Sequence, residues 1–157
     1  MDFSAIHLHL ALNHSPLFAQ IFALCLILFG LIRRRREFVT AALVVTIIAA
    51  VCGFLADQTG GRAADLVTKA NPPIAGVDTS LIREHGQAAE WVLITSGICA
   101  VIAIIALFLG RRGARPRWIE IVLAVLILHA LTVSARTALL GGRIHHQEVR
   151  PVSSGTP

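Results

Sequence analysis

Four long apolar stretches constrain this chain more than any other feature of its sequence. A helix of about 20 apolar residues spans the roughly 30 Å hydrocarbon core of a bilayer. Only 15% of the residues are charged, whereas a water-soluble domain needs about a quarter to cover its surface. The sequence therefore predicts an all-α integral membrane four-helix bundle in one domain (1–150), followed by a flexible tail (151–157). The four predicted spans are 16–33, 38–56, 90–110 and 117–140.

The ends of these stretches carry residues that cap or break helices. Ser15 is expected to cap the first membrane helix, since its hydroxyl can accept a free N–H of the first turn. The third helix is expected to begin outside the bilayer, at Asp78 or Thr79. Gly141-Gly142 is expected to end the fourth helix. No internal repeat is apparent.

Basic residues gather in two of the loops that join the apolar stretches. Four arginines occupy 33–36 and four more lie within 111–117, so these loops hold eight of the 14 basic residues. Basic loops stay in the cytoplasm, which places both termini and the central segment 57–90 on the outer side of the membrane. That central segment is expected to be a loop with a short helix over 62–69. Because the basic residues lie at membrane boundaries, nucleic acid is excluded as a partner.

Histidines are unusually frequent for so apolar a chain. Neutral imidazole is the commonest transition-metal ligand, and helix bundles build cofactor sites from facing side chains. The convergence of His14, His85 and His146 predicts a haem or metal site, whereas a single interfacial histidine is more often an ordinary surface residue. His129 is expected within the bilayer, hydrogen-bonded inside the bundle. The other six of the seven histidines are expected on the periplasmic side: His7, His9, His14, His85, His145 and His146.

Helical periodicity distinguishes the surroundings of His14 and His85. Small residues below His85 either leave a slot for a flat macrocycle or let helices pack closely. Arg136 is expected to pair with a haem propionate or to extend to the interface, and Glu120 to pair with a cytoplasmic arginine. The stripe below His14 is Leu17, Ile21 and Cys25, and that below His85 is Ala88, Ala89, Val92, Ser96 and Cys99.

Several short segments resemble those of a protein family. They are HLHLALNHSP at 7–16, Thr59-Gly60, His85 with Ala88 and Ala89, and LGGRIHHQE at 140–148. Together they resemble small bacterial four-helix inner-membrane proteins, some of which are fused to, or lie near, Rieske and other redox domains. The resemblance implies haem binding, and the family's recurrent histidines correspond to His14, His85 and His146, with His7 and His9 in the opening segment. The chain departs from the pattern at Gly86, where Glu is usual, and at His145, where Arg is usual.

The leading hypothesis from these observations is a b-type haem protein of electron transfer. His14 and His85 are the expected axial ligands near the periplasmic surface. His146 and His9 would support them or bind a second haem, and Arg136 and Arg143 would neutralise propionates. The lipid bilayer surrounds the bundle, and a larger redox complex or a periplasmic electron carrier is the expected partner.

Two alternatives from other functional classes stay open. Copper or zinc would suit the same His14, His85 and His146, because imidazole binds either ion. An accessory subunit of a larger membrane complex would need no special role for the histidines. The sequence offers no nucleophile beside a base, no phosphate-binding glycine loop and no general acid–base pair, which argues against an independent enzyme.

Overall fold

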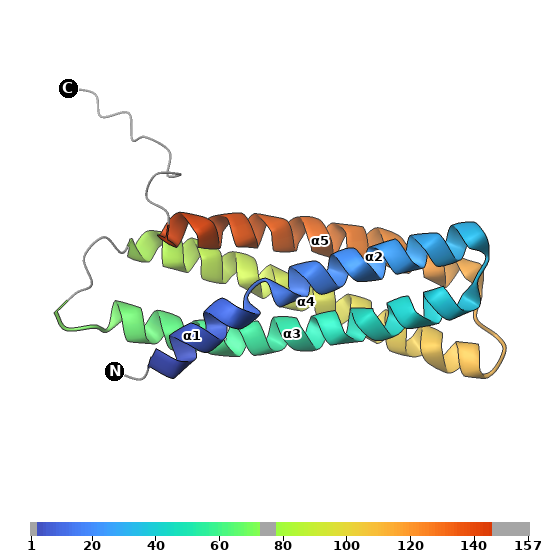
Figure 1. Ribbon diagram of the computed structural model, residues 1–157, viewed down its shortest axis with the longest axis horizontal. Coiled ribbons are helices and arrows are strands. Elements are labelled where there is room, and N and C mark those ends of the chain that lie inside the picture. Colours follow the sequence, from blue (N-terminus) through green and yellow to red (C-terminus); the bar gives the residue numbers. More distant parts are fainter. Residues whose placement is uncertain (1–2, 73–77, 146–157) are drawn as a thin grey trace, which may run out of the picture.

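The computed structural model describes residues 3–72 and 78–145, and nearly all of these residues are helical. In chain order the helices are α1 (Phe3–Leu12), α2 (Ser15–Arg33), α3 (Arg36–Thr68), α4 (Thr79–Arg111) and α5 (Arg117–His145) (Figure 1). The predicted tail over 151–157 lies outside the described residues.

Four helical stretches are long and apolar enough to span a membrane. The first joins α1 and α2 across a short break at 13–14, and the other three correspond to α3, α4 and α5. The prediction of an all-α, four-helix, multi-pass membrane protein is therefore confirmed. The stretches are Ala5–Arg33, Arg36–Thr68, Thr79–Arg111 and Arg117–Ile144.

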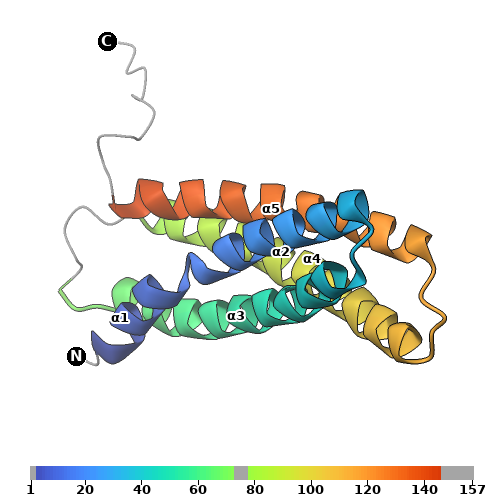
Figure 2. The same cartoon turned by 45° about the vertical axis from the view of Figure 1, so that its right-hand side comes forward.

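The membrane helices form an up-and-down bundle. α2 and α4 each pack against α3 and α5, so α2 and α4 face each other across the bundle. α1 packs mainly against α3. Figures 1 and 2 show the α2–α3 and α4–α5 turns together at one end, which we call the arginine end (33–36 and 111–117). The opposite end, which we call the histidine end, contains α1, the last turns of α3 and α5 and the first turns of α4.

Small residues line the bundle interior, and large apolar residues cover its outside. Ala23, Ala42 and Ala103 are completely buried, whereas Trp91 and Trp118 are 61% and 63% exposed. Lipid tails are as apolar as leucine, so nothing drives large side chains inward, and small ones allow close helix contact. Trp91 lies toward the histidine end and Trp118 at the arginine end, as expected for aromatic anchors at two membrane surfaces.

The helix starts agree with the capping predictions at one site and differ at another. Asp78 caps α4, where its carboxylate accepts the backbone N–H of Ser80 at 2.9 Å. Ser15 is not the N-cap of α2, because His14 occupies that position. The Ser15 hydroxyl instead donates to the carbonyl of Leu12 at 2.6 Å, which ties α2 to α1.

Both Gly-Gly pairs lie inside helices, contrary to the prediction. α3 continues through Gly60-Gly61 to Thr68, so the predicted loop with a short helix over 62–69 is wrong for this part of the chain. α5 likewise continues through Gly141-Gly142 to His145. Glycine is a poor helix former, but it allows another group to approach the helix closely. The first glycine of each pair has that function, as shown below.

The two halves of the chain share short features at comparable positions, although the intervals between them differ. Gln20 on α2 donates to Ser96 on α4 at 2.9 Å, 76 positions later. His85 follows His9 by the same interval. Gly-Gly-Arg occurs on α3 at 60–62 and again on α5 at 141–143. The hairpin of α1–α2 with α3 thus corresponds to the hairpin of α4 with α5 across the bundle.

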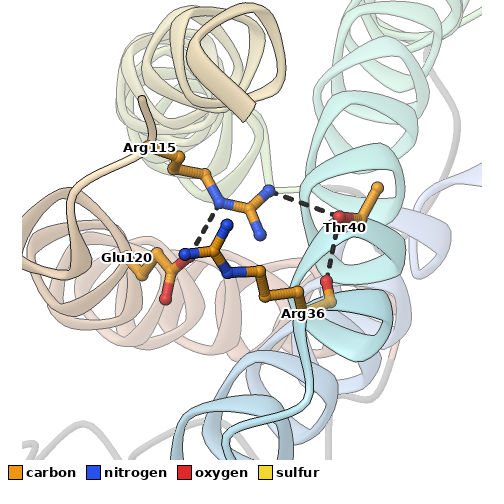
Figure 3. A network of polar contacts seen from close by, with 4 residues as sticks. All are labelled: Arg36, Thr40, Arg115 and Glu120. Carbon is orange, nitrogen blue, oxygen red and sulfur yellow. Dashed lines mark hydrogen bonds and ion pairs between the residues drawn. The ribbon is translucent and has the colours of Figure 1, made fainter. Parts of the chain in front are cut away.

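A buried ion pair closes the arginine end. Arg115 Nε lies 2.7 Å from Glu120 Oε1, and the two side chains are only 4% and 11% exposed. Arg115 Nη1 also donates to the Thr40 hydroxyl at 3.3 Å, which joins the α4–α5 turn to α3 (Figure 3). The predicted pairing of Glu120 with an arginine is confirmed.

Candidate cofactor site

Two histidines from facing helices meet at the histidine end. The ring centroids of His9 on α1 and His85 on α4 are 6.3 Å apart, and the ring planes are inclined by 77°. Both residues are half-buried. Because α1 continues α2, which lies across the bundle from α4, the pair connects diagonally opposed helices. We call His9 and His85 the histidine pair.

Each ring of the pair is held by the backbone of a neighbouring helix. His9 Nδ1 lies 3.0 Å from the carbonyl oxygen of Ala56 on α3, and His85 Nδ1 lies 3.0 Å from that of Thr137 on α5. A carbonyl oxygen only accepts hydrogen bonds, so Nδ1 carries the proton in both rings. In neutral imidazole the lone pair is then on Nε2. Metal-binding histidines typically have this tautomer, fixed by the same kind of hydrogen bond.

A glycine one helical turn after each accepting carbonyl makes room for the ring. A Cβ added to Gly60 would lie 2.9 Å from His9 Cε1, and one added to Gly141 would lie 3.0 Å from His85 Cε1. The same addition at Gly61 or Gly142 would meet nothing within 4 Å. Each ring therefore contacts helix backbone directly, and the two histidines occupy equivalent sites in the two hairpins.

His14, the predicted partner of His85, is exposed at the α1–α2 break. Its Nδ1 is hydrogen-bonded to the side chain of the adjacent Asn13. The physical reason is the helix break at 13–14: His14 lies in the break with its side chain exposed, whereas His9 lies on α1 against α3. Among the described residues it is His9, expected only in a supporting role, that meets His85.

The remaining predicted site residues do not join the pair in the part of the chain that is described. His146 and the side chain of His145 lie outside that part. His129 was expected to bond inside the bundle, but it is exposed on α5 because Ile127 and Ala130 take the inward positions. Arg136 and Arg143 are both exposed toward the histidine end of α5.

The small residues below His85 pack against other helices and form no slot for a macrocycle. Val92, Ser96 and Cys99 are buried. The cavity that Ser96 and Cys99 line together with Gln20 has a volume of about 10 Å³, which holds about one water molecule. At this level of the bundle the small residues therefore permit close helix packing.

The histidine pair offers too few ligands for an ordinary zinc site. Within 3–72 and 78–145, no three His, Cys, Asp or Glu residues are grouped so that they could hold an ion. Zinc sites use three or four protein ligands, whereas two imidazoles would suffice to hold a haem or a two-coordinate cuprous ion.

The spacing of the rings also fits one shared metal atom. Two imidazoles on opposite sides of one metal would have centroids about 6.4 Å apart, given metal–nitrogen bonds of about 2.0 Å and about 1.2 Å from each nitrogen to its centroid, and rings in ordinary edge contact have similar separations. The observed separation is 6.3 Å. Donor type, tautomer and ring separation are therefore compatible with a bis-imidazole site.

Sequence reasoning misses Arg62 and the role of the glycines. Arg62 is exposed on α3 two positions after Gly60, as Arg143 is on α5 two positions after Gly141. The signal that would have identified both groups is the Gly-Gly-Arg tripeptide, which occurs once in each hairpin.

Comparison of the chain with protein-family models, with curated proteins and with solved structures finds no match. The family resemblance described above therefore stays a prediction. The functional argument depends on the geometry of the histidine pair.

Proposed function

We propose that this protein is a multi-pass protein of a bacterial inner membrane that binds a b-type haem through His9 and His85 and transfers electrons. The observation that carries the proposal is the pair of imidazoles 6.3 Å apart, each with Nδ1 bonded to a backbone carbonyl. His85 keeps the role expected from the sequence, and His9 takes the place of His14 as the second ligand.

Ligation by two imidazoles favours electron transfer over catalysis. A haem held by His9 and His85 would supply single-electron transfer, and the two imidazoles would leave its iron no site for oxygen or substrate. The carbonyls of Ala56 and Thr137 orient the rings and make Nε2 a stronger electron donor. Gly60 and Gly141 let both rings stay against their helices.

Arginines at the histidine end of the bundle are the candidates to neutralise haem propionates. Arg62 and Arg143 occupy equivalent, exposed positions after the two glycine pairs. Arg136 is exposed next to Thr137 and has no hydrogen bond or ion pair with another described residue. A carboxylate partner would lower the cost of placing this cation near hydrocarbon.

The distribution of arginines supports a periplasmic location for the histidine pair. The two basic loops lie together at the arginine end, which the positive-inside rule assigns to the cytoplasm. The pair is half-buried at the opposite end of the bundle. A periplasmic electron carrier or a larger membrane redox complex can approach it there.

The test is the visible spectrum of the protein purified in detergent, recorded before and after reduction with dithionite, together with metal analysis. We expect a Soret band, and α and β bands that sharpen on reduction, from one haem per chain. Ring planes inclined by 77° also predict a strongly anisotropic low-spin ferric EPR signal, because nearly perpendicular imidazoles leave iron d orbitals close in energy.

The ligand assignment is tested with three alanine variants. His9→Ala and His85→Ala are each expected to lose haem, whereas His14→Ala, an exposed histidine at the same end, is expected to keep it. Full haem occupancy in both His9→Ala and His85→Ala would refute the assignment. A colourless wild-type protein with stoichiometric copper or zinc would favour the metal-ion alternative, and one without any metal would favour the accessory subunit.

A further inference from the structure

A polar pocket opens at the arginine end, opposite the histidine pair. Its volume is about 220 Å³. It lies where the end of α2 meets the starts of α3 and α5. Its charged lining consists of five arginines and one carboxylate: Arg34, Arg35, Arg36, Arg115, Arg117 and Glu120.

Carboxylates neutralise only two of these arginines. Arg115 is paired with buried Glu120 at 2.7 Å, and Arg35 with exposed Glu37 at 3.4 Å. The other three have no carboxylate within ion-pair distance among the described residues: Arg34, Arg36 and Arg117. The pocket therefore contains positive charge that the described protein groups leave uncompensated.

Hydrogen bonds hold the pocket in shape. Arg115 is fixed between Glu120 and Thr40, and Figure 3 shows the Arg36 guanidinium extending toward the same pair. Arg117 Nη2 donates to the carbonyl of Leu31 at 3.1 Å, which joins α5 to the end of α2. The cations are thus gathered by contacts between elements that are far apart in the chain.

We propose that this pocket binds a phosphate group. Guanidinium groups bind phosphate oxygens through paired N–H donors, and several around one pocket hold it more tightly than one alone. α3 begins beside the pocket without a side-chain cap at Arg35, so the N–H groups of its first turn add donors and the positive end of the helix dipole.

The place of the pocket indicates where such a phosphate comes from. Two membrane helices begin and one ends around it, which is the depth of phospholipid headgroups. The headgroup of an anionic phospholipid and free inorganic phosphate share the same recognition chemistry. The experiment therefore includes both as separate arms.

The test compares two double variants with equal loss of charge at the same end of the bundle. Arg34→Gln/Arg36→Gln removes two pocket cations, whereas Arg111→Gln/Arg112→Gln removes two exposed arginines of the α4–α5 turn outside the pocket. Binding of phosphatidylglycerol, phosphatidylcholine and inorganic phosphate to each detergent-purified protein is measured by native mass spectrometry and by shifts in unfolding temperature. Arg117→Gln is a second pocket variant, and circular dichroism checks folding.

We expect phosphatidylglycerol to bind the wild type in preference to phosphatidylcholine, and to bind the pocket variants about tenfold or more weakly. The matched control should bind within about twofold of the wild type. Competition by millimolar inorganic phosphate supports free phosphate as a natural occupant, and binding of the lipid without such competition supports the headgroup. Equal weakening in pocket and control variants, or no binding of either phosphate source to the wild type, would overturn the proposal.

Discussion

Substitution of Gly141 tests the histidine site independently of any cofactor. A Cβ at position 141 would lie 3.0 Å from Cε1 and 3.2 Å from Nδ1 of His85, whereas a Cβ at position 142 would meet nothing within 4 Å. The two glycines are consecutive in α5. Gly141→Ala and Gly142→Ala therefore change helix propensity equally, but only Gly141→Ala displaces the imidazole.

The expected difference in stability between the two variants follows from two opposing effects: better helix propensity, and displacement of the His85 ring. Alanine in place of a helical glycine stabilises by about 0.5–1 kcal/mol, so Gly142→Ala should be slightly more stable than the wild type. Gly141→Ala has the same stabilising effect on the helix, but it pushes His85 away from the Thr137 carbonyl. Loss of that hydrogen bond costs about 1 kcal/mol of stability. Crowding raises the total cost to about 1–3 kcal/mol. For a chain of this size, that difference in stability between the two variants corresponds to roughly 3–10 °C in unfolding temperature.

Thermal unfolding in detergent, followed by tryptophan fluorescence, measures this difference, and the visible spectrum of each variant measures haem content. Gly60→Ala and Gly61→Ala repeat the comparison at His9 in the other hairpin, where a Cβ would lie 2.9 Å from Cε1 at position 60 and meet nothing at position 61. Equal unfolding temperatures for Gly141→Ala and Gly142→Ala, with equal haem content, would refute the contact between His85 and α5.

Two further predictions concern the arginine end and the orientation of the bundle. Arg115→Gln leaves Glu120 buried without its cation and should lower the free energy of unfolding by about 3–5 kcal/mol. Arg35→Gln removes an exposed ion pair and should lower it by less than about 1 kcal/mol. Equal losses for the two variants in chemical unfolding would contradict the buried pair. In a background without the three native cysteines, Glu84→Cys should react with an impermeant maleimide from the periplasm and Arg112→Cys only after the membrane is permeabilised. The reverse labelling pattern would overturn the proposed orientation.

The number and approximate positions of the membrane helices were accessible from sequence because they depend on local properties. Length and lack of charge define each span, and the cap at Asp78 depends on a side chain and an N–H two residues away. The break at 13–14 and the helical state of both Gly-Gly pairs were not accessible in this way. A glycine pair ends a helix or admits a neighbour depending on what packs against it, and the histidines that pack there are about fifty positions distant or more.

In the candidate site too, features that depend on local sequence could be predicted, and features that depend on packing could not. His85 was recognisable because it stands above a stripe of small residues, and an arginine partner for Glu120 was expected from the nearby basic loop. The sequence could not decide whether His9 or His14 meets His85, since both lie in one short segment. The pocket formed by Arg34, Arg36 and Arg117 likewise combines side chains from two loops, each of which by itself looks like an ordinary cytoplasmic basic cluster.

By itself the sequence determined that this chain spans a membrane with four helices and that its arginines gather in two loops, because hydrocarbon accepts only long uncharged stretches whose backbone groups bond within the helix. Only the tertiary structure decided that His9 meets His85, that each ring lies against a glycine, and that two arginine loops form one pocket. Those contacts depend on the rotational phase of each helix and on packing between distant helices, which the local character of a segment does not specify.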